Sequence, residues 1–219
     1  MSKRKTVSPG DGPPEAVERD ARPPVEAIRA AAFAQFAERG YPVVTVRDIM
    51  KACGLTQGAL YNHFKSKDEL LHDIIASTQS ELERLCQQAV AGAGPDARAQ
   101  LAAFVRVYVM RHCRLRIEAL VANREIGWLD TARVSDIRRS RRAIRDIVVT
   151  ILAHGVENDV FDPPRVEGKH DLKAIAMALL DQCTHVSMWY GPGGDLAEEQ
   201  MAKLYADMAL RVVGAKPQD

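Results

Sequence analysis

The sequence predicts an all-α protein in which a small three-helix unit precedes a larger helical body. Apolar side chains recur at spacings of three and four residues along most of the chain after residue 24, as on the buried face of a helix. No stretch alternates apolar and polar residues for long enough to indicate a sheet. Glycine and proline gather in short groups between these stretches, where helices are expected to end.

Length and composition are those of an ordinary globular protein. The 219 residues suffice for one small and one larger domain. Lys plus Arg total 30 against 29 for Asp plus Glu, so any affinity for DNA must come from a few locally placed cations. The four cysteines are widely scattered, and no apolar stretch reaches membrane-spanning length. We therefore expect a cytoplasmic protein with reduced thiols and no membrane partner.

Residues 1–23 combine prolines and glycines with charged side chains and have almost nothing to bury, so we expect a disordered N-terminal arm. Lys3, Arg4 and Lys5 could follow a DNA backbone, as basic arms do, or form a solvated tail. The solvated tail is the simpler interpretation. A helix is predicted over residues 25–39, ending at Gly40, with an apolar face formed by Ile28, Ala31, Ala32 and Phe36.

Two short helices joined by a tight turn are predicted over residues 45–64. Thr45 and Asp48 form a capping box at the start of the first helix. Gly54 stands where the chain leaves that helix, most easily in a left-handed conformation. Thr56 can cap the second helix, which is expected over residues 57–64. On this helix Leu60 faces the core, and polar or small side chains face elsewhere.

This arrangement is typical of a helix-turn-helix, whose second helix enters the DNA major groove. Gly58 and Ala59 keep that helix thin enough to approach base edges. Base preference is expected to depend on Gln57 and Asn62, and phosphate contacts on the flanking side chains. The alternative is an ordinary pair of core helices. The full set expected to reach DNA is Thr45, Arg47, Thr56, Gln57, Gly58, Ala59, Tyr61, Asn62, His63 and Lys67.

Residues 58–70, GALYNHFKSKDEL, are the most specific motif of the N-terminal third. Through this motif the N-terminal third resembles the DNA-binding domain of the TetR family of transcriptional regulators. Met50 and Cys53 are bulkier than the alanines that the family usually carries there, and we expect both to be packing changes. The resemblance implies a DNA-binding domain over residues 24–70 and rests on Ile28, Ala31, Ala32, Phe36, Gly40, Thr45, Ile49, Gly54, Leu55, Gly58, Leu60, Tyr61, His63, Phe64, Lys67 and Leu70.

The rest of the chain, residues 71–214, is expected to form a helical effector-binding and dimerisation domain. Ser66 and Glu69 form a second capping box, from which a helix runs to about residue 91 and spans about 39 Å. Groups of Gly and Pro end this helix and separate those that follow it. The later helices are predicted over residues 96–113, 115–128, 131–158, 170–190 and 195–213.

The C-terminal half resembles the effector-binding half of TetR-type regulators. WYGPGGDL, residues 189–196, is similar to a segment in regulators of sterol and fatty-acid catabolism that respond to acyl-CoA thioesters. LAHGVENDVF, residues 152–161, matches a helix ending common in the family. The resemblance implies a hydrophobic small-molecule effector, and an acyl-CoA thioester is one candidate.

An apolar cavity with a few polar groups would suit such an effector. Aromatic and methionine side chains at helical spacing are also what a plain core contains, so both interpretations stay open. Arginines crowd the helix over residues 131–158, among them Arg133, Arg139, Arg141 and Arg145. They could bind the phosphates of coenzyme A or form a solvated cationic face. The expected cavity residues are Phe104, Tyr108, His112, Trp128, Arg138, Arg142, Met177, Asp181, His185 and Trp189.

The last two helices carry apolar stripes that suit a self-complementary interface across a two-fold axis or, alternatively, packing within one subunit. One recognition helix reads too few bases for useful specificity, which favours a homodimer on a palindromic DNA operator. The expected interface residues are Ile175, Leu179, Val186, Met201, Leu204, Tyr205 and Met208.

No catalytic, metal-binding, phosphate-loop or dinucleotide motif occurs in the sequence. We therefore expect no catalytic residues, no metal site and no cofactor. The leading hypothesis is a DNA-binding repressor that an effector releases from its operator. The alternative is a helical small-molecule-binding protein or enzyme that does not bind DNA.

Overall fold

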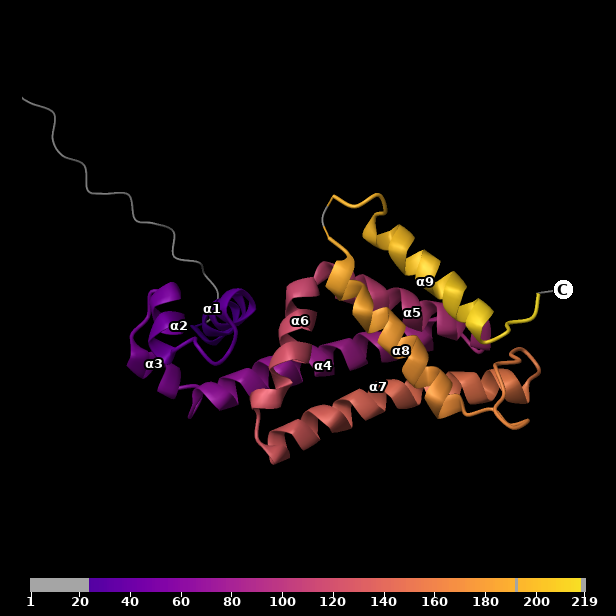
Figure 1. The fold of residues 1–219 in the computed structure, drawn as a ribbon, viewed down its shortest axis with the longest axis horizontal. Helices are drawn as coiled ribbons and strands as arrows, with labels where there is room; N and C mark the ends of the chain where they lie inside the picture. Colours follow the sequence, from indigo (N-terminus) through magenta and orange to yellow (C-terminus); the bar gives the residue numbers. More distant parts are fainter. Residues whose placement is uncertain (1–23, 192, 218–219) are drawn as a thin grey trace, which may run out of the picture.

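The computed structural model describes residues 24–191 and 193–217, and helices account for most of them (Figure 1). Within these ranges no strand occurs, and pairing of the β type is limited to two isolated bridges, Phe161 with Ala215 and Val166 with Lys169. The all-α prediction is confirmed. The helices are α1 (Pro24–Arg39), α2 (Val46–Ala52), α3 (Gln57–Tyr61), α4 (Lys67–Gly92), α5 (Ala97–Arg114), α6 (Arg116–Arg124), the 3₁₀ turn η1 (Glu125–Trp128), α7 (Thr131–Glu157), α8 (Leu172–Trp189) and α9 (Glu198–Val212).

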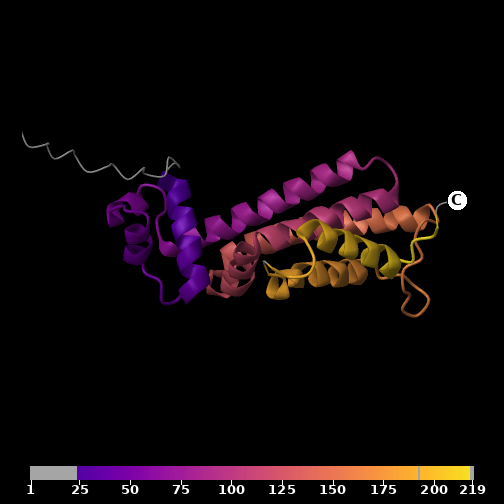
Figure 2. The same ribbon diagram turned by 90° about the horizontal axis from the view of Figure 1, so that it is seen from above.

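The molecule is elongated, with α1, α2 and α3 grouped at one end (Figures 1 and 2). Helix α4 leads away from this group and packs against α5 and α7. Helices α8 and α9 cover the other side of α5, and the C-terminal end of α9 lies far from α3. Helix α6 runs across the long helices and contacts both α1 and α8, so it links the two ends of the molecule.

Two hydrophobic cores hold these layers together. The first is built by α1, α2, α3 and the first turns of α4. It also includes Val121 of α6, Leu129, which follows η1, and Ile137 of α7. The second lies among the long helices and includes Leu101, Phe104 and Leu152, each at most 1% exposed. The first core therefore contains side chains from both parts of the chain, and α4 passes through the domain boundary expected near residue 70.

Caps account for where several helices begin. The Thr45 hydroxyl accepts a hydrogen bond from the Asp48 amide, and the Asp48 carboxylate accepts one from the Thr45 amide, so the predicted capping box is confirmed. Ser66 caps α4 by accepting from the Glu69 amide, while the Glu69 carboxylate accepts from the Lys65 amide. Gly54 has a φ of 66°, which confirms the predicted left-handed exit from α2.

Several predicted boundaries differ from the structure. Helix α3 ends at Tyr61 rather than near residue 64, and the Thr56 side chain makes no capping hydrogen bond. The segment predicted as one helix over residues 115–128 is divided into α6 and η1, where the chain tightens from α to 3₁₀ geometry. Helix α9 begins at Glu198, three residues later than predicted. The arm expected over residues 1–23 lies outside the described residues.

The end of α7 depends on Gly155. This residue is buried, and a Cβ atom built on it would clash with the ring of Phe161. The Val160 and Phe161 amides both donate to the Gly155 carbonyl oxygen, at 2.8 and 3.0 Å, which turns the chain back over the helix. A side chain at residue 155 is therefore incompatible with this turn.

Candidate functional site

Helix α3 presents polar and small side chains to solvent. Leu60 is fully buried and Phe64 is 5% exposed, so this side of the segment packs into the first core. On the other side Tyr61 is 60% exposed. The remaining exposed residues of the predicted DNA-contacting face are Gln57, Gly58, Asn62 and His63, and Ala59 is partly buried. An exposed face with hydrogen-bonding groups and no bulky side chain near residue 58 can approach base edges.

The flanking residues differ in how free their side chains are. Thr45 is exposed, but its hydroxyl is engaged with Asp48 in the capping box. The Thr45 amide and hydroxyl hold the pKa of Asp48 below its ordinary value. Arg47 is exposed, and so is Thr56 at the start of α3. Because the Thr56 hydroxyl makes no capping bond, it is available to a partner.

Lys67 lies in a different setting from the free phosphate-binding side chain that the sequence suggests. Its ammonium donates hydrogen bonds to the carbonyl oxygens of Tyr41, at 2.9 Å, and Val44, at 2.8 Å. Burial lowers the pKa of Lys67. The Tyr41 hydroxyl donates to the Asp68 carboxylate. The start of α4 therefore holds the loop between α1 and α2 in place.

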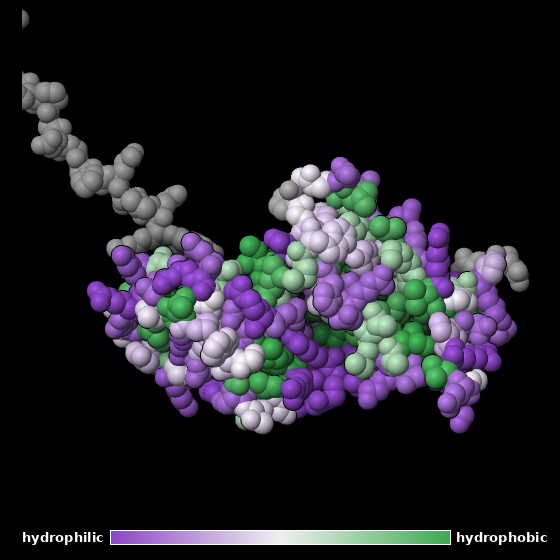
Figure 3. Space-filling view, viewed as in Figure 1, coloured by the Kyte–Doolittle hydropathy of each residue, from purple (hydrophilic) through white to green (hydrophobic). Residues whose placement is uncertain are grey.

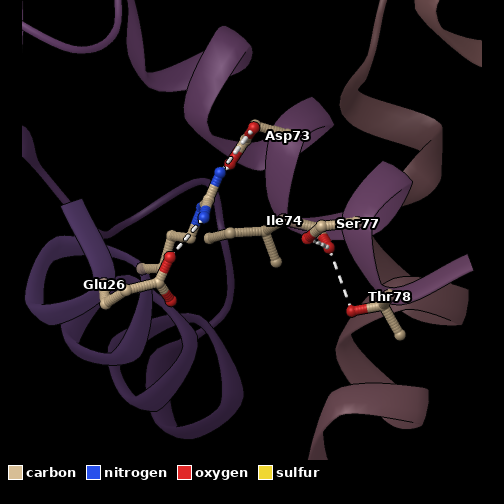
Figure 4. Close-up of polar contacts among 6 residues, drawn as sticks. Glu26, Asp73, Ile74, Ser77 and Thr78 are labelled. Atoms are coloured by element: carbon tan, nitrogen blue, oxygen red, sulfur yellow. Dashed lines mark hydrogen bonds and ion pairs between the residues drawn. The ribbon is translucent and has the colours of Figure 1, made fainter. Parts of the chain in front are cut away.

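A second contact joins α1 to α4 (Figure 4). The Arg29 guanidinium donates to both Asp73 carboxylate oxygens, at 2.7 and 3.0 Å, and to Glu26 at 2.6 Å. The hydrogen bonds to Asp73 raise the pKa of Arg29. One turn further along α4, the hydroxyls of Ser77 and Thr78 donate to the Ile74 carbonyl. These hydrogen bonds therefore fix the orientation of α1 relative to α4.

A cavity of about 690 Å³ lies among the long helices and reaches α6. Its volume falls within the range usual for small-molecule sites, about 300–1,000 Å³. Figure 3 shows a hollow in this region, between apolar side chains and a rim of polar ones. The lining residues are Thr78, Gln79, Leu82, Tyr108, Arg111, His112, Leu115, Ala119, Ala122, Asn123, Arg141, Arg142, Ile144, Arg145, Met177, Ala178, Leu180, Asp181, Thr184, His185, Ser187 and Met188.

The lining carries more positive than negative charge, with four arginines and one carboxylate, that of Asp181. Arg145 is paired with Asp146 at 2.5 Å, and Arg111 lies 3.4 Å from Glu118. Arg141 donates only to uncharged oxygens, and burial lowers its pKa. The cavity can therefore accept an anionic group beside its apolar surface.

Polar groups on the α5 wall of the cavity are held in place by hydrogen bonds. His112 is 7% exposed, and its Nδ1 donates to the Tyr108 carbonyl oxygen at 2.8 Å. Burial lowers the pKa of His112 to about 4, so the ring is neutral at physiological pH. The hydroxyls of Tyr108 and Thr184 lie 2.9 Å apart and connect α5 to α8. On this wall these groups are uncharged, and Arg111 supplies the positive charge.

Both parts of the chain match known protein families. Residues 28–74 match the bacterial regulatory proteins of the tetR family, and residues 94–213 match the tetracyclin repressor-like C-terminal domain. The chain belongs to the TetR family. It is therefore a DNA-binding transcriptional regulator, and the function predicted from the helix-turn-helix is confirmed.

Individual relatives of this TetR-family chain agree with that assignment. The HTH-type transcriptional repressor KstR2 of Mycobacterium tuberculosis is 31% identical over 196 residues, which cover 82% of this chain and 87% of the relative. A tetR-family regulatory protein from Rhodococcus RHA1 is 29% identical with a TM-score of 0.79, over 88% of this chain and 98% of its own. AibR, solved with isovaleryl coenzyme A and operator DNA, shares the fold with a TM-score of 0.74 at 20% identity, over 88% and 99% of the two chains.

Six of the ten predicted cavity residues of this TetR-family regulator line the cavity: Tyr108, His112, Arg142, Met177, Asp181 and His185. The other four lie elsewhere. Phe104 is buried in the second core, and Arg138 is exposed on α7 outside the lining. Trp128 lies beside the Tyr41 ring, with 6.4 Å between ring centres, and Trp189 is 60% exposed.

The lining also contains residues that the sequence reading omitted from its cavity set, such as Arg111, Leu115 and Thr184. Helical periodicity could have found them. Tyr108 and His112 are four residues apart, and the same face continues through Arg111 and Leu115. Arg141 and Arg145 belong to the arginine-rich helix for which the sequence leaves phosphate binding and a solvated face open, and both line the cavity.

The predicted dimer residues of this TetR-family chain do not share one surface. Leu179, Val186, Met201 and Tyr205 are at most 8% exposed and pack into the second core, because α8 and α9 turn those stripes toward α5. Ile175 and Met208 are partly buried, and Leu204 is 44% exposed. Apolar side chains nevertheless gather on the face of α8 and α9 seen in Figure 3. The large apolar residues exposed there or in the loop between them are Met177, Met188, Trp189, Leu196, Leu204 and Val212.

Within residues 24–191 and 193–217, no three or more His, Cys, Asp or Glu side chains are grouped so as to hold a metal ion. None of the helices in these ranges has the length and hydropathy needed to cross a bilayer.

Proposed function

We propose that this chain is a homodimeric, ligand-released repressor that acts in the cytoplasm on a palindromic operator and has no catalytic activity. In this proposal residues 24–70 bind DNA, and residues 71–214 bind the effector and the second subunit. The exposed face of α3 enters the major groove, with Gln57 and Asn62 at base edges. Arg47, Thr56, Tyr61 and His63 are placed to contact the backbone.

Dimerisation is supported by the exposed apolar residues on α8 and α9. Trp189, Leu204 and Val212 are 41–60% exposed, which is unusual for several large apolar residues on two successive helices. A two-fold axis beside these helices would bury them against the same surface of a second copy. Two α3 helices would then face successive major grooves, as a palindromic site requires.

The proposed effector is a hydrophobic small molecule with an anionic group, such as an acyl-CoA thioester. The observation that carries this proposal is the apolar cavity of about 690 Å³, whose lining has four arginines and one carboxylate. The acyl group would occupy the apolar part, and the phosphates would lie against Arg142 and its neighbours. AibR, which shares the fold, is solved with a coenzyme A thioester and operator DNA.

The effector can release DNA only if it binds the DNA-incompetent state more tightly, since equal affinity for both states shifts nothing. The coupling is reciprocal. Operator DNA must therefore weaken effector binding by the same factor by which the effector weakens DNA binding.

A fluorescence anisotropy titration on palindromic DNA from the gene's own upstream region tests the proposal. We expect salt-dependent binding with two subunits per site, and release by palmitoyl-CoA or isovaleryl-CoA. Arg142→Ala should weaken thioester binding without changing DNA affinity, whereas Arg139→Ala, whose side chain pairs with Asp136 outside the cavity, should leave both unchanged. Failure to bind DNA even at low salt would reject the repressor assignment, and indifference to every thioester would reject the effector class.

A further inference from the structure

Two arginines donate hydrogen bonds to carbonyl oxygens at the C-terminal ends of two helices, α6 and α1. Arg141, on α7, donates from Nη2 to the Ala122 carbonyl oxygen at 3.3 Å and to Asn123 Oδ1 at 2.9 Å. Ala122 belongs to the last turn of α6, where carbonyl groups lack partners within the helix and attract cations. Arg141 therefore holds the end of α6.

The residue that follows Asn123 makes the same kind of contact with the DNA-binding part. Arg124 donates from Nη2 to the Phe36 carbonyl oxygen at 2.6 Å, and it lies 3.5 Å from the Ala37 carbonyl oxygen. Both carbonyls belong to the last turn of α1. The end of α6 thus holds the end of α1.

Glu125 fixes the geometry of this second contact. Its carboxylate accepts from Arg124 Nε at 2.6 Å, and the residue is only 2% exposed. A buried carboxylate without its cation is costly, so Arg124 has little freedom to turn away while Glu125 stays in place. Trp128, three residues further on, lies beside Tyr41 at the start of the loop after α1, and its fluorescence can report on this joint.

Arg141 is also the lining arginine best suited to change partners. It is partly buried, and among the residues that the structure describes no carboxylate lies within 4.0 Å of its guanidinium. Its present acceptors are a carbonyl and an amide oxygen, both uncharged. A phosphate or carboxylate entering the cavity would be a stronger acceptor than either of them.

We propose that Arg141 is the positioning residue that couples the cavity to the DNA-binding helices. An anionic group of the effector draws the Arg141 guanidinium away from Ala122 and Asn123. The last turn of α6 loosens, Arg124 loses its fixed position on α1, and the orientation of α1, α2 and α3 relative to α4 changes. The effector step rests on the proposed function, but the link from Arg141 to α1 exists without an effector and can be tested alone.

The first test uses the full-length protein without ligand. Arg141→Gln should increase amide hydrogen exchange at the end of α6 and also in the last turn of α1, residues 36–40. It should lower operator affinity by about fivefold or more, within the range of roughly 5- to 150-fold that is typical of allosteric couplings. Arg139→Gln is the matched control, because Arg139 lies on the same helix but pairs with Asp136 outside the cavity. Increased exchange that stops at α6 in Arg141→Gln, with wild-type operator affinity, would overturn the proposal.

The second test uses palmitoyl-CoA as the probe. Arg124→Gln should bind the probe as tightly as the wild type does, since Arg124 does not line the cavity, but the probe should no longer change operator affinity or Trp128 emission. Asn123→Ala, which removes one acceptor of Arg141, should give a smaller loss of coupling with an intact Arg124 contact. Full release of DNA by the probe in Arg124→Gln would overturn the proposal. If the wild type binds no thioester, the effector class proposed above fails, and the exchange experiment still decides the role of Arg141.

Discussion

The Lys67 ammonium lies 4.0 Å from the centre of the Tyr41 ring and donates to the carbonyl oxygen of the same residue. Lys67 is the first residue of α4, and Tyr41 lies in the loop between α1 and α2. This one side chain therefore combines a cation–π contact with hydrogen bonds that hold the helix-turn-helix on α4. Its role is first of all structural.

Lys67→Met should consequently destabilise the protein. Loss of the hydrogen bonds from a charged donor to Tyr41 and Val44 should lower the free energy of unfolding by about 1–3 kcal/mol, measured by urea denaturation. The salt dependence of operator binding should keep its wild-type slope, because the ammonium is not free to replace counterions on DNA. Lys65→Met, at an exposed position, should leave stability unchanged. A slope reduced by about one, with wild-type stability, would instead identify Lys67 as a phosphate contact.

The two threonines that precede helices α2 and α3 should respond differently to the same change. Thr45→Ala removes the capping box and should cost about 1 kcal/mol of stability. Thr56→Ala removes no capping bond, so stability should remain within about 0.5 kcal/mol of the wild type. Because the Thr56 hydroxyl is free, its removal should appear in operator affinity. Equal losses of stability at both positions would contradict the difference seen in the structure.

Substitutions on the exposed face of α3 and the residue after it should distinguish side chains that read bases from those that contact the DNA backbone. Gln57→Ala or Asn62→Ala should change which operator bases are preferred, with a loss of about 1–3 kcal/mol at the affected base pair. Tyr61→Ala should weaken binding to all duplexes to a similar degree. Selection from a randomised duplex library measures both effects. Unchanged base preference in Gln57→Ala and Asn62→Ala would exclude these two side chains from base readout.

Gly155 should tolerate no side chain. Gly155→Ala places a methyl group into the Phe161 ring, and we expect a loss of stability of about 3 kcal/mol or more. Gly92→Ala is the matched control, since the space around Gly92 is open, and its effect should be neutral or stabilising. The double variant Gly155→Ala, Phe161→Leu should recover part of the loss. Wild-type thermal stability in Gly155→Ala would show that the end of α7 packs differently.

His112 should make the stability depend on pH. Its pKa is lowered to about 4 in the folded state from an ordinary value of 6.5, so the unfolded chain binds the additional proton between these values. The contribution of the buried, neutral His112 ring to the free energy of unfolding is fully present above pH 6.5. It falls by about 3 kcal/mol in total as the pH falls toward 4. His112→Asn should remove this part of the pH dependence. The exposed His185→Asn serves as a control and should keep it. Parallel stability curves for the wild type and His112→Asn would contradict the burial of a neutral ring.

The helix-turn-helix was predictable because its signals are local. The capping box at Thr45 and the left-handed glycine at residue 54 each depend on atoms a few residues apart, and both are present in the structure. The end of α3 was less predictable. Leu60 and Phe64 both face the core whether or not the helix continues, so periodicity alone does not define the last turn.

Local signals also determined the all-α fold, the order of the helices and the polar face of α3, because helical periodicity, caps and glycine exits are properties of neighbouring residues. Tertiary packing alone decided which apolar stripe of α8 and α9 faces α5, and so buried Leu179 and Tyr205 within the subunit. It also brought Arg141 into contact with Asn123, and Arg124 into contact with the end of α1. The physical reason is that hydrogen bonds and burial between distant segments depend on the angles at which helices cross. The spacing of residues along the sequence does not determine these crossing angles.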